Sequence, residues 1–106
     1  MARYDPSTIL ITTGGQTLAT AEVHPTGTAG VVHSDLHVES GHLPPGTRTR
    51  LVDAVLEHPD VHGAERLMAT MPIGDSEMLE RVRERYDDVE ARAAGATTLV
   101  EARLEK

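Results

Sequence analysis

The sequence predicts an α/β (α+β) protein whose elements follow the order βββαβαβ, with a mixed sheet and two helices packed on it. The chain of 106 residues has the usual length of one domain, so we expect a single compact domain over residues 1–106. Apolar and polar residues alternate early in the chain, as in strands, and helical spacing appears in two later segments. Leu, Ile and Val supply 23 residues against two aromatic ones, which predicts an aliphatic core.

Three strands are expected first. A β-branched run over residues 8–13 is closed by Gly14 and Gly15, which is typical of a strand followed by a tight turn. Alternation then covers residues 16–24 and resumes over 31–39, with turn residues between them. These two segments predict a hairpin.

The first helix and the fourth strand are expected in the middle of the chain. Residues 41–46 hold two prolines and two glycines, which indicates a loop, and Thr47 can cap the helix that follows. Apolar residues at helical spacing continue until His58 and Pro59 end the helix. Alternation over residues 65–71 then predicts a strand.

The longest helical pattern in the chain covers residues 77–94, with apolar side chains every three or four positions. Asp75 or Ser76 is expected to cap this helix, and Gly95 suits its C-terminal end. Residues 97–104 alternate once more and predict the last strand. Both helices are crossover connections, so they cover one face of the sheet, and a ligand or a second subunit must cover the other.

Composition excludes several classes of function. Seventeen acidic residues against ten basic ones give a net charge of −7, which repels phosphate backbones, so we expect no nucleic-acid partner. The chain has no cysteine and therefore no disulfide, thiolate nucleophile or sulfur-ligated zinc. A membrane-spanning helix needs about 20 apolar residues, and every apolar run in the chain is far shorter. We therefore expect no membrane contact and a cytoplasmic location.

One strand carries a row of polar side chains. His33, Asp35, His37 and Glu39 share a face, and a turn around Gly27 and Thr28 would bring Glu22 near His33. Imidazoles and carboxylates this close can ligate a metal or supply a general base. Ligand sets usually draw on more than one element, and such alternation is typical of a half-solvated strand. We therefore favour a solvated or interface face and predict no metal.

Three adjoining segments resemble the central motif of the GNAT acetyltransferases. They are Leu36-His37-Val38-Glu39, the loop from His42 to Arg50, and the helical segment 51–57. In that family a strand leads into a glycine-containing loop, whose amides and following helix hold the pyrophosphate of acetyl-CoA. Gly46 matches the middle glycine of the loop motif, whereas Leu43 and Arg48 replace its other two positions. The resemblance covers roughly residues 16–104 and implies a compact, degenerate GNAT-like domain.

The resemblance also implies a ligand and its binding residues. The expected cofactor is acetyl-CoA or CoA, and the expected function is that of an acyl-CoA-binding protein. The pantetheine would meet strand backbone and the pyrophosphate would meet the loop, which assigns cofactor binding to Leu36, Val38, Gly46, Thr47, Arg48 and Thr49. The strands over 31–39 and 65–71 must then splay apart, because the cofactor enters between them.

If the domain is active, the resemblance implies an N-acetyltransferase. His37 or Glu39 would deprotonate the acceptor amine. The segment from Arg92 to Ala96 resembles the end of the last helix of the family, which places Ala91 where the family often has a tyrosine acid.

Two further classes of function stay open. The first is a non-catalytic homodimeric or adaptor module that binds a protein partner through the uncovered sheet face or the acidic second helix. The other is a ferredoxin-like binder of a small ligand, because ββαβαβ elements can also be arranged in that way.

Overall fold

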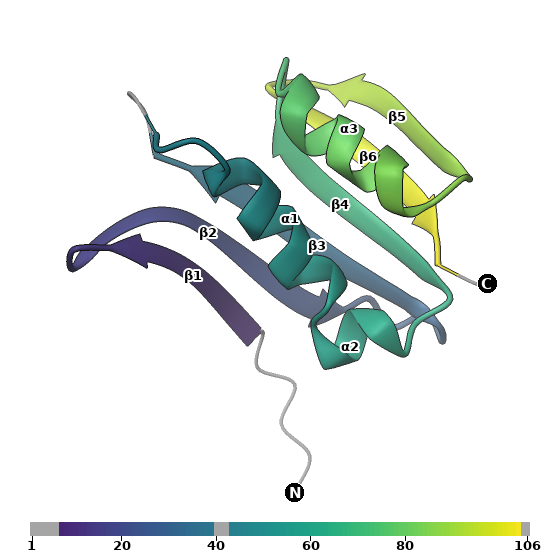
Figure 1. Ribbon diagram of the computed structural model, residues 1–106. Coiled ribbons are helices and arrows are strands. Elements are labelled where there is room, and N and C mark those ends of the chain that lie inside the picture. The colour runs from purple at the N-terminus through teal and green to yellow at the C-terminus, as the bar shows by residue number, and fades with distance from the viewer. Residues whose placement is uncertain (1–6, 40–42, 105–106) are drawn as a thin grey trace, which may run out of the picture.

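The computed structural model describes residues 7–39 and 43–104 of the chain. Within these residues six strands form one sheet, in the order β1-β2-β3-β4-β6-β5, with three helices against it (Figure 1). The elements are β1 (Ser7–Thr13), β2 (Gln16–Pro25), β3 (Val31–Val38), α1 (Thr47–Leu56), α2 (Pro59–His62), β4 (Arg66–Pro72), α3 (Ser76–Arg85), β5 (Val89–Ala94) and β6 (Thr97–Arg103). The predicted fold class, a single-domain mixed sheet with helices packed on it, is confirmed.

Strand pairing divides the sheet into two antiparallel halves. The first half is β1-β2-β3 and the second is β4-β6-β5, and they meet where β3 runs parallel to β4. Gly14 and Gly15 turn the chain between β1 and β2 with φ angles of 59° and 81°, which glycine adopts without a steric penalty. The predicted tight turn after the first strand is therefore confirmed.

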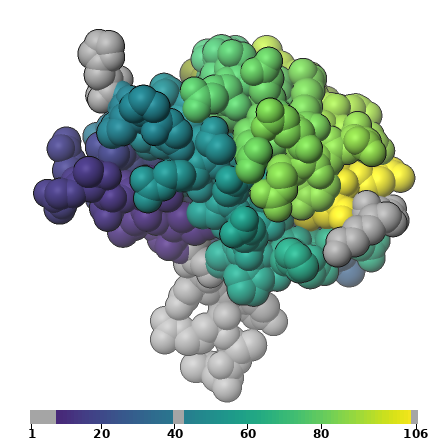
Figure 2. All heavy atoms as spheres, viewed as in Figure 1, coloured from purple at the N-terminus to yellow at the C-terminus, as the bar shows by residue number. Residues whose placement is uncertain are grey.

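Helices α1 and α3 cover one face of the sheet, and their atoms lie against each other in the space-filling view (Figure 2). Beneath them the core is aliphatic, as predicted. Leu51 and Val52 of α1 and Met78 of α3 are 0% exposed. Beneath α1, Ala19 and Ala21 of β2 are also buried, and such small side chains let a helix approach the sheet closely. The described residues place no helix on the opposite face.

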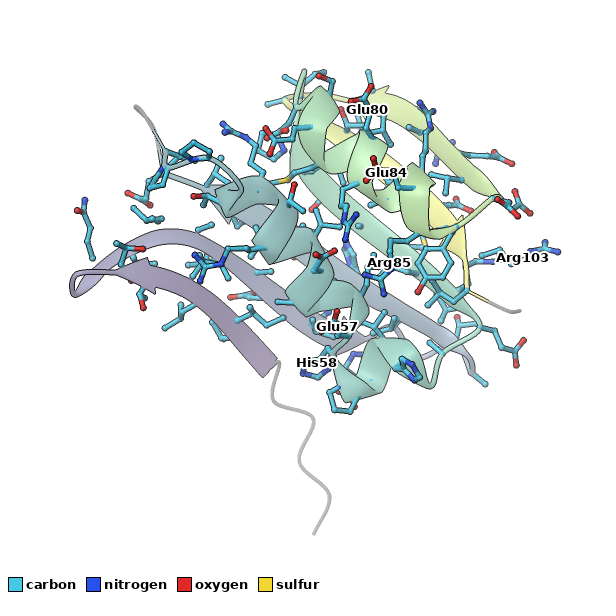
Figure 3. The ribbon with its side chains drawn as sticks, in the orientation of Figure 1. Glu57, His58, Glu80, Glu84, Arg85 and Arg103 are labelled. Carbon is cyan, nitrogen blue, oxygen red and sulfur yellow. The ribbon has the colours of Figure 1, made fainter. Side chains whose placement is uncertain are left out.

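A group of ion pairs joins the two helices on the outside of the core. Arg81 of α3 donates two hydrogen bonds to the carboxylate of Asp53 in α1, of 2.7 Å to Oδ1 and 3.0 Å to Oδ2. Arg85 adds a third, of 3.2 Å, and its guanidinium lies 3.9 Å from Glu57 at the end of α1 (Figure 3). The hydrogen bond from Arg81 holds the pKa of Asp53 below its ordinary value, against the smaller opposing effect of burial.

The predicted long helix over residues 77–94 is wrong in its second half. Helix α3 ends at Arg85, and residues 89–94 form β5, which pairs with β6. Val89 and Ala93 fit a helical spacing, but residues 89, 91 and 93 fit the period of a strand equally well. Pairing with β6 decides between them, and Gly95, with a φ of 68°, turns the hairpin rather than ending a helix. The described chain thus has one strand more than βββαβαβ and, because of the short α2, three helices rather than the predicted two.

The same correction shows that one expected similarity to the GNAT acetyltransferases, at the end of their last helix, is wrong. Arg92 to Ala94 lie in β5 and Ala96 follows the turn glycine, so these residues do not end a helix. Ala91 is likewise a strand residue and cannot occupy a position on the last helix.

Two helix starts also differ from the prediction. Gly46 rather than Thr47 is the N-cap of α1, and Thr47 lies buried inside the first turn. Pro59, predicted to end a helix, also begins the short helix α2, where a missing N–H does no harm. His58 caps α2 by accepting a hydrogen bond at Nδ1 from the amide of Asp60, at 3.1 Å.

None of the described helices is both long enough and apolar enough to span a bilayer.

Candidate functional site

Strands β3 and β4 separate at one end. Residues 31–35 of β3 pair with residues 66–70 of β4, and the ladder stops there although β3 continues to Val38 and β4 to Pro72. Each strand keeps its outer partner over this stretch, because β3 stays with β2 and β4 stays with β6. The two halves of the sheet therefore diverge beyond the pair Asp35 and Thr70, at the end where α1 and α3 begin (Figure 1). The splay predicted for these strands is confirmed.

The N-terminus of α1 lies at this open end. Gly46 has a φ of 85°, a left-handed conformation that favours glycine, and it has no side chain to accept from the first amides of the helix. Thr47 is only 2% exposed, and its hydroxyl donates to the carbonyl of Pro44 at 2.7 Å, which fixes the loop before the helix. The first turn contains no acidic residue and carries Arg48 and Arg50. This helix end is therefore electropositive.

The N-terminus of α3 lies beside it, and an ion pair connects the two helix ends. Asp75 caps α3, as predicted, by accepting from the amide of Met78 at 3.2 Å. The other oxygen of the same carboxylate accepts from Nε of Arg48 at 2.8 Å, and the Asp75 side chain is 6% exposed. Thr49 lies 3.5 Å from a carboxylate oxygen of Glu77. Acidic groups of α3 thus partly neutralise the positive end of α1.

A shallow cavity of about 330 Å³, largely open to solvent, lies between these helix ends. Two of the residues predicted to bind a cofactor, Val38 and Arg48, line it. The remaining lining comes from the last residue of β4, from the segment between β4 and α3, and from the first turn of α3, namely Pro72, Ile73, Gly74, Asp75, Ser76 and Glu77. Sequence reasoning recognised Asp75 as a helix cap and missed that it faces Arg48, because that contact joins residues 27 positions apart.

The other predicted site residues are spread around the opening between the ends of β3 and β4, which we call the split. Leu36 is buried in the core at 4% exposure, so only its backbone faces the widening gap. His37 is exposed on the face away from the helices, and Glu39 is exposed just beyond β3. Neither lines the cavity. His42, in the loop that resembles the family motif, lies outside the described residues.

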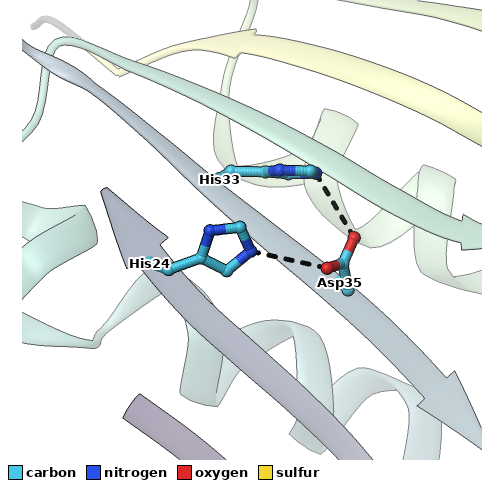
Figure 4. Close-up of side chains that lie close together, drawn as sticks. All are labelled: His24, His33 and Asp35. Carbon is cyan, nitrogen blue, oxygen red and sulfur yellow. Dashed lines mark hydrogen bonds and ion pairs between the residues drawn. The ribbon is translucent and has the colours of Figure 1, made fainter. Parts of the chain in front are cut away.

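On the face away from the helices, a cluster of side chains lies at the vertex of the split. His24 of β2 pairs with His33 of β3 in the hairpin register, and both rings contact Asp35 (Figure 4). His24 Nε2 is 3.5 Å from Asp35 Oδ2, and His33 Nε2 is 3.3 Å from Asp35 Oδ1. Thr70 of β4 donates its hydroxyl to Oδ1 of the same carboxylate. The cluster thus draws on three strands.

The cluster corrects the predicted arrangement of this face. Glu22, expected near His33, pairs in register with Asp35 and is exposed, whereas His24 takes the place opposite His33. Burial raises the pKa of Asp35, but the hydrogen bond from Thr70 and the two neighbouring histidines outweigh it and hold the pKa below the ordinary value.

No family model matches the chain, and no curated protein matches it in sequence. Solved structures do match its fold. The Salmonella typhimurium protein yncA, provisionally assigned as an acetyltransferase and solved with its cofactor acetyl-CoA, superposes with a TM-score of 0.66 at 10% identity, over 95% of this chain and 66% of its own. The GNAT domain of PAT from S. lividans matches with a TM-score of 0.65 at 16% identity, over 95% of this chain and 62% of its own.

An N-acetylglutamate synthase from Neisseria gonorrhoeae, in complex with coenzyme A and N-acetyl-glutamate, gives a TM-score of 0.66 at 15% identity, over 93% of this chain and 26% of its own. These similarities establish a GNAT fold, so the predicted GNAT-like domain is confirmed at the level of fold. The chain spans no more than 66% of the length of any of the three.

Proposed function

We propose that this protein binds acyl-CoA at the open end between β3 and β4 and transfers the acyl group to an amine. The observation that supports the proposal best is the split itself, which carries a cavity lined by Val38 and Arg48 between two helix N-termini. Structural neighbours with the same fold were solved with acetyl-CoA and with coenzyme A.

The diphosphate of the ligand would meet the first turn of α1. The amides of Thr47 and Arg50 already donate to the carbonyls of Pro44 and Gly46, which leaves the amides of Arg48 and Thr49 for an anion. The side chains of Arg48 and Arg50 add positive charge, and anions are favoured at such a helix end. Asp75 and Glu77 oppose this charge. Binding therefore requires Arg48 to exchange its contact with Asp75 for a contact with phosphate.

The pantetheine arm would lie along the free edge of β3. Residues 36–38 pair with β2 on one side but with no residue of β4 on the other, so their backbone groups on that side are available. An extended, amide-containing chain can pair with such an edge as a further strand does. Ile73, 52% exposed beside the cavity, offers an apolar contact at its rim.

The reaction that fits this ligand is aminolysis of a thioester. The amine nitrogen forms a bond to the acyl carbon, the carbon–sulfur bond breaks, and the thiolate of CoA takes up a proton. The roles predicted for His37 and Glu39 as proton acceptor stay predictions, as does the cytoplasmic location.

Calorimetric titration of the purified protein with acetyl-CoA and with CoA tests the proposal. We expect saturable binding that Arg48→Glu weakens at least tenfold, because the substitution places a negative charge where phosphate binds. Arg83→Glu is the matched control, since Arg83 is exposed on α3 and does not line the cavity. Absence of binding to the wild-type protein, or an equal loss in both variants, would contradict the proposal.

Release of free CoA thiol from acetyl-CoA, measured with a panel of amines, separates transfer from binding. Thiol release that depends on the amine supports an acetyltransferase. Binding without release in any amine leaves an acyl-CoA-binding protein and rejects the transfer step.

The uncovered sheet face favours a second candidate, a homodimeric or adaptor module. No described element covers this face, and Leu10, on the edge strand β1, projects from it with 56% exposure. Sedimentation velocity over a range of concentrations tests the candidate. The candidate predicts a dimer that Leu10→Asp dissociates. It is rejected if the protein is a monomer at every concentration and if a pull-down captures no partner protein.

A further inference from the structure

The face of the sheet away from the helices carries a cluster that none of the proposed acyl-CoA contacts uses. His24, His33 and Asp35 each offer one ligand atom, and these three atoms lie within 4.8 Å of one another. From this geometry we propose that His24, His33 and Asp35 bind a divalent transition-metal ion of the Zn²⁺ class. The site is separate from the cavity at the helix ends, so the proposal does not depend on acyl-CoA binding.

The distances suit one ion held between the three side chains. Ligand atoms about 2.0–2.1 Å from a tetrahedral Zn²⁺ are about 3.3–3.4 Å apart. His24 Nε2 lies 3.5 Å from Oδ2 of Asp35 and His33 Nε2 lies 3.3 Å from Oδ1, so each nitrogen is near that spacing from one carboxylate oxygen. The three ligand atoms together lie within 4.8 Å, so only a small movement of the side chains is needed to close them around one ion. The imidazole rings are tilted by 59° with centroids 4.9 Å apart, so they do not stack, and both Nε2 atoms face the carboxylate (Figure 4).

The ligands come from different strands. His24 lies at the end of β2, whereas His33 and Asp35 are two positions apart on β3 and share a face. The sequence predicts no metal because most of the candidate ligands lie on one strand and because alternation of polar and apolar residues is typical of a half-solvated strand. The hairpin register removes the first objection, since it brings His24 directly opposite His33.

Two further observations support an ion at this position. The hydroxyl of Thr70 donates to Asp35, which orients the carboxylate as outer hydrogen bonds orient metal ligands. Nε2 of His33 is buried and has no hydrogen-bond partner among the described residues, although it lies close to Asp35. A bound cation would satisfy this nitrogen.

The donor set indicates which ions fit. Two imidazoles with one carboxylate favour Zn²⁺, Co²⁺ or Ni²⁺ over Mg²⁺ and Ca²⁺, which prefer oxygen ligands. Each of the three side chains is about 30% exposed, so an ion can enter from solvent and water can complete its coordination.

Titration of the untagged protein with ZnCl₂ in a calorimeter, and with CoCl₂ in an absorption spectrometer, tests the site. We expect one ion per chain and the visible absorption of four- or five-coordinate Co²⁺. His24→Gln and His33→Gln should each weaken binding at least tenfold. His62→Gln is the matched control because His62 is exposed in α2 and belongs to no such cluster.

A second measurement needs no variant. In the wild-type protein, adding Zn²⁺ should shift the imidazole resonances of His24 and His33 in two-dimensional NMR and leave those of His62 unchanged. Lack of saturable binding, an equal loss in the His62→Gln control, or unshifted His24 and His33 resonances would each overturn the proposal. The NMR result decides the question if a cluster variant does not fold.

Discussion

The ion pair between Arg48 and Asp75 should oppose binding of CoA, and Asp75→Asn is the substitution that isolates this effect. Asp75 does two things at once, since it caps α3 through the amide of Met78 and holds Arg48 at 2.8 Å. Asparagine caps helices about as well as aspartate, so the variant keeps the cap and removes only the charge.

Stability and affinity should change in opposite directions. Loss of a partly exposed ion pair costs about 0.2–1 kcal/mol. For a domain of this size that loss lowers the melting temperature by about 1 to 8 °C. If the phosphate charge is taken to lie about 8 Å from the Asp75 carboxylate, on the far side of Arg48, the repulsion between them is about 0.5 kcal/mol at the permittivity of water and about 2 kcal/mol at an effective value of 20. Removing it should therefore tighten CoA binding about twofold to thirtyfold.

Thermal melting and calorimetric titration with CoA measure both changes on the same samples. Asp60→Asn is the charge-matched control, because Asp60 is an exposed residue of α2 that does not line the cavity. The reasoning is refuted if Asp75→Asn binds CoA no more tightly than wild type, or if Asp60→Asn produces the same gain.

Three other predictions concern the scaffold. Gly46→Ala should lower the melting temperature, because a φ of 85° strains any residue with a Cβ, whereas Gly63→Ala, at a φ of −89°, should not; equal shifts would contradict this. Leu51→Ala should cost about 2–5 kcal/mol in chemical denaturation, since Leu51 is a fully buried residue of α1, and a loss below about 1 kcal/mol would show that α1 packs loosely. The pKa of Asp53 is lowered in the folded state, so its stabilising effect is present above the ordinary value of 3.8 and is lost as the pH falls through the folded value. Asp53→Asn should therefore reduce the acid dependence of stability in urea titrations between about pH 5 and pH 2, and an unchanged dependence would contradict that assignment.

Local signals were sufficient for most of the fold. The glycine pair after β1, the Asp75 cap and the aliphatic spacing of α1 each determine structure through contacts within a few residues. The end of α3 could not be predicted in this way. Residues 89–93 satisfy both periods, and their choice of β5 depends on pairing with β6 across the Gly95 turn.

The histidine cluster shows how a small difference in a turn changes a site. A turn centred on Gly27 and Thr28 places Glu22 opposite His33, but the actual register pairs His24 with His33. The turn instead includes both Gly27 and Gly30 in left-handed conformations, and Thr26 closes it by donating to the carbonyl of Val31 at 3.0 Å. The centre moves by one position, which changes the partner of His33 by two residues on the same face.

The two candidate sites lie on opposite faces of the sheet, near the end of the β3–β4 ladder. Asp35 and Thr70 form its last pair, and the Asp35 side chain points away from the helices, toward the histidines. Leu36, the next residue, points into the core under the helices, and from there on β3 has no partner in β4. Alternation along one strand therefore assigns neighbouring residues to opposite faces. Since the sheet separates the two sites, a charge change at Arg48 should alter CoA binding without altering metal binding, and loss of His33 should do the reverse.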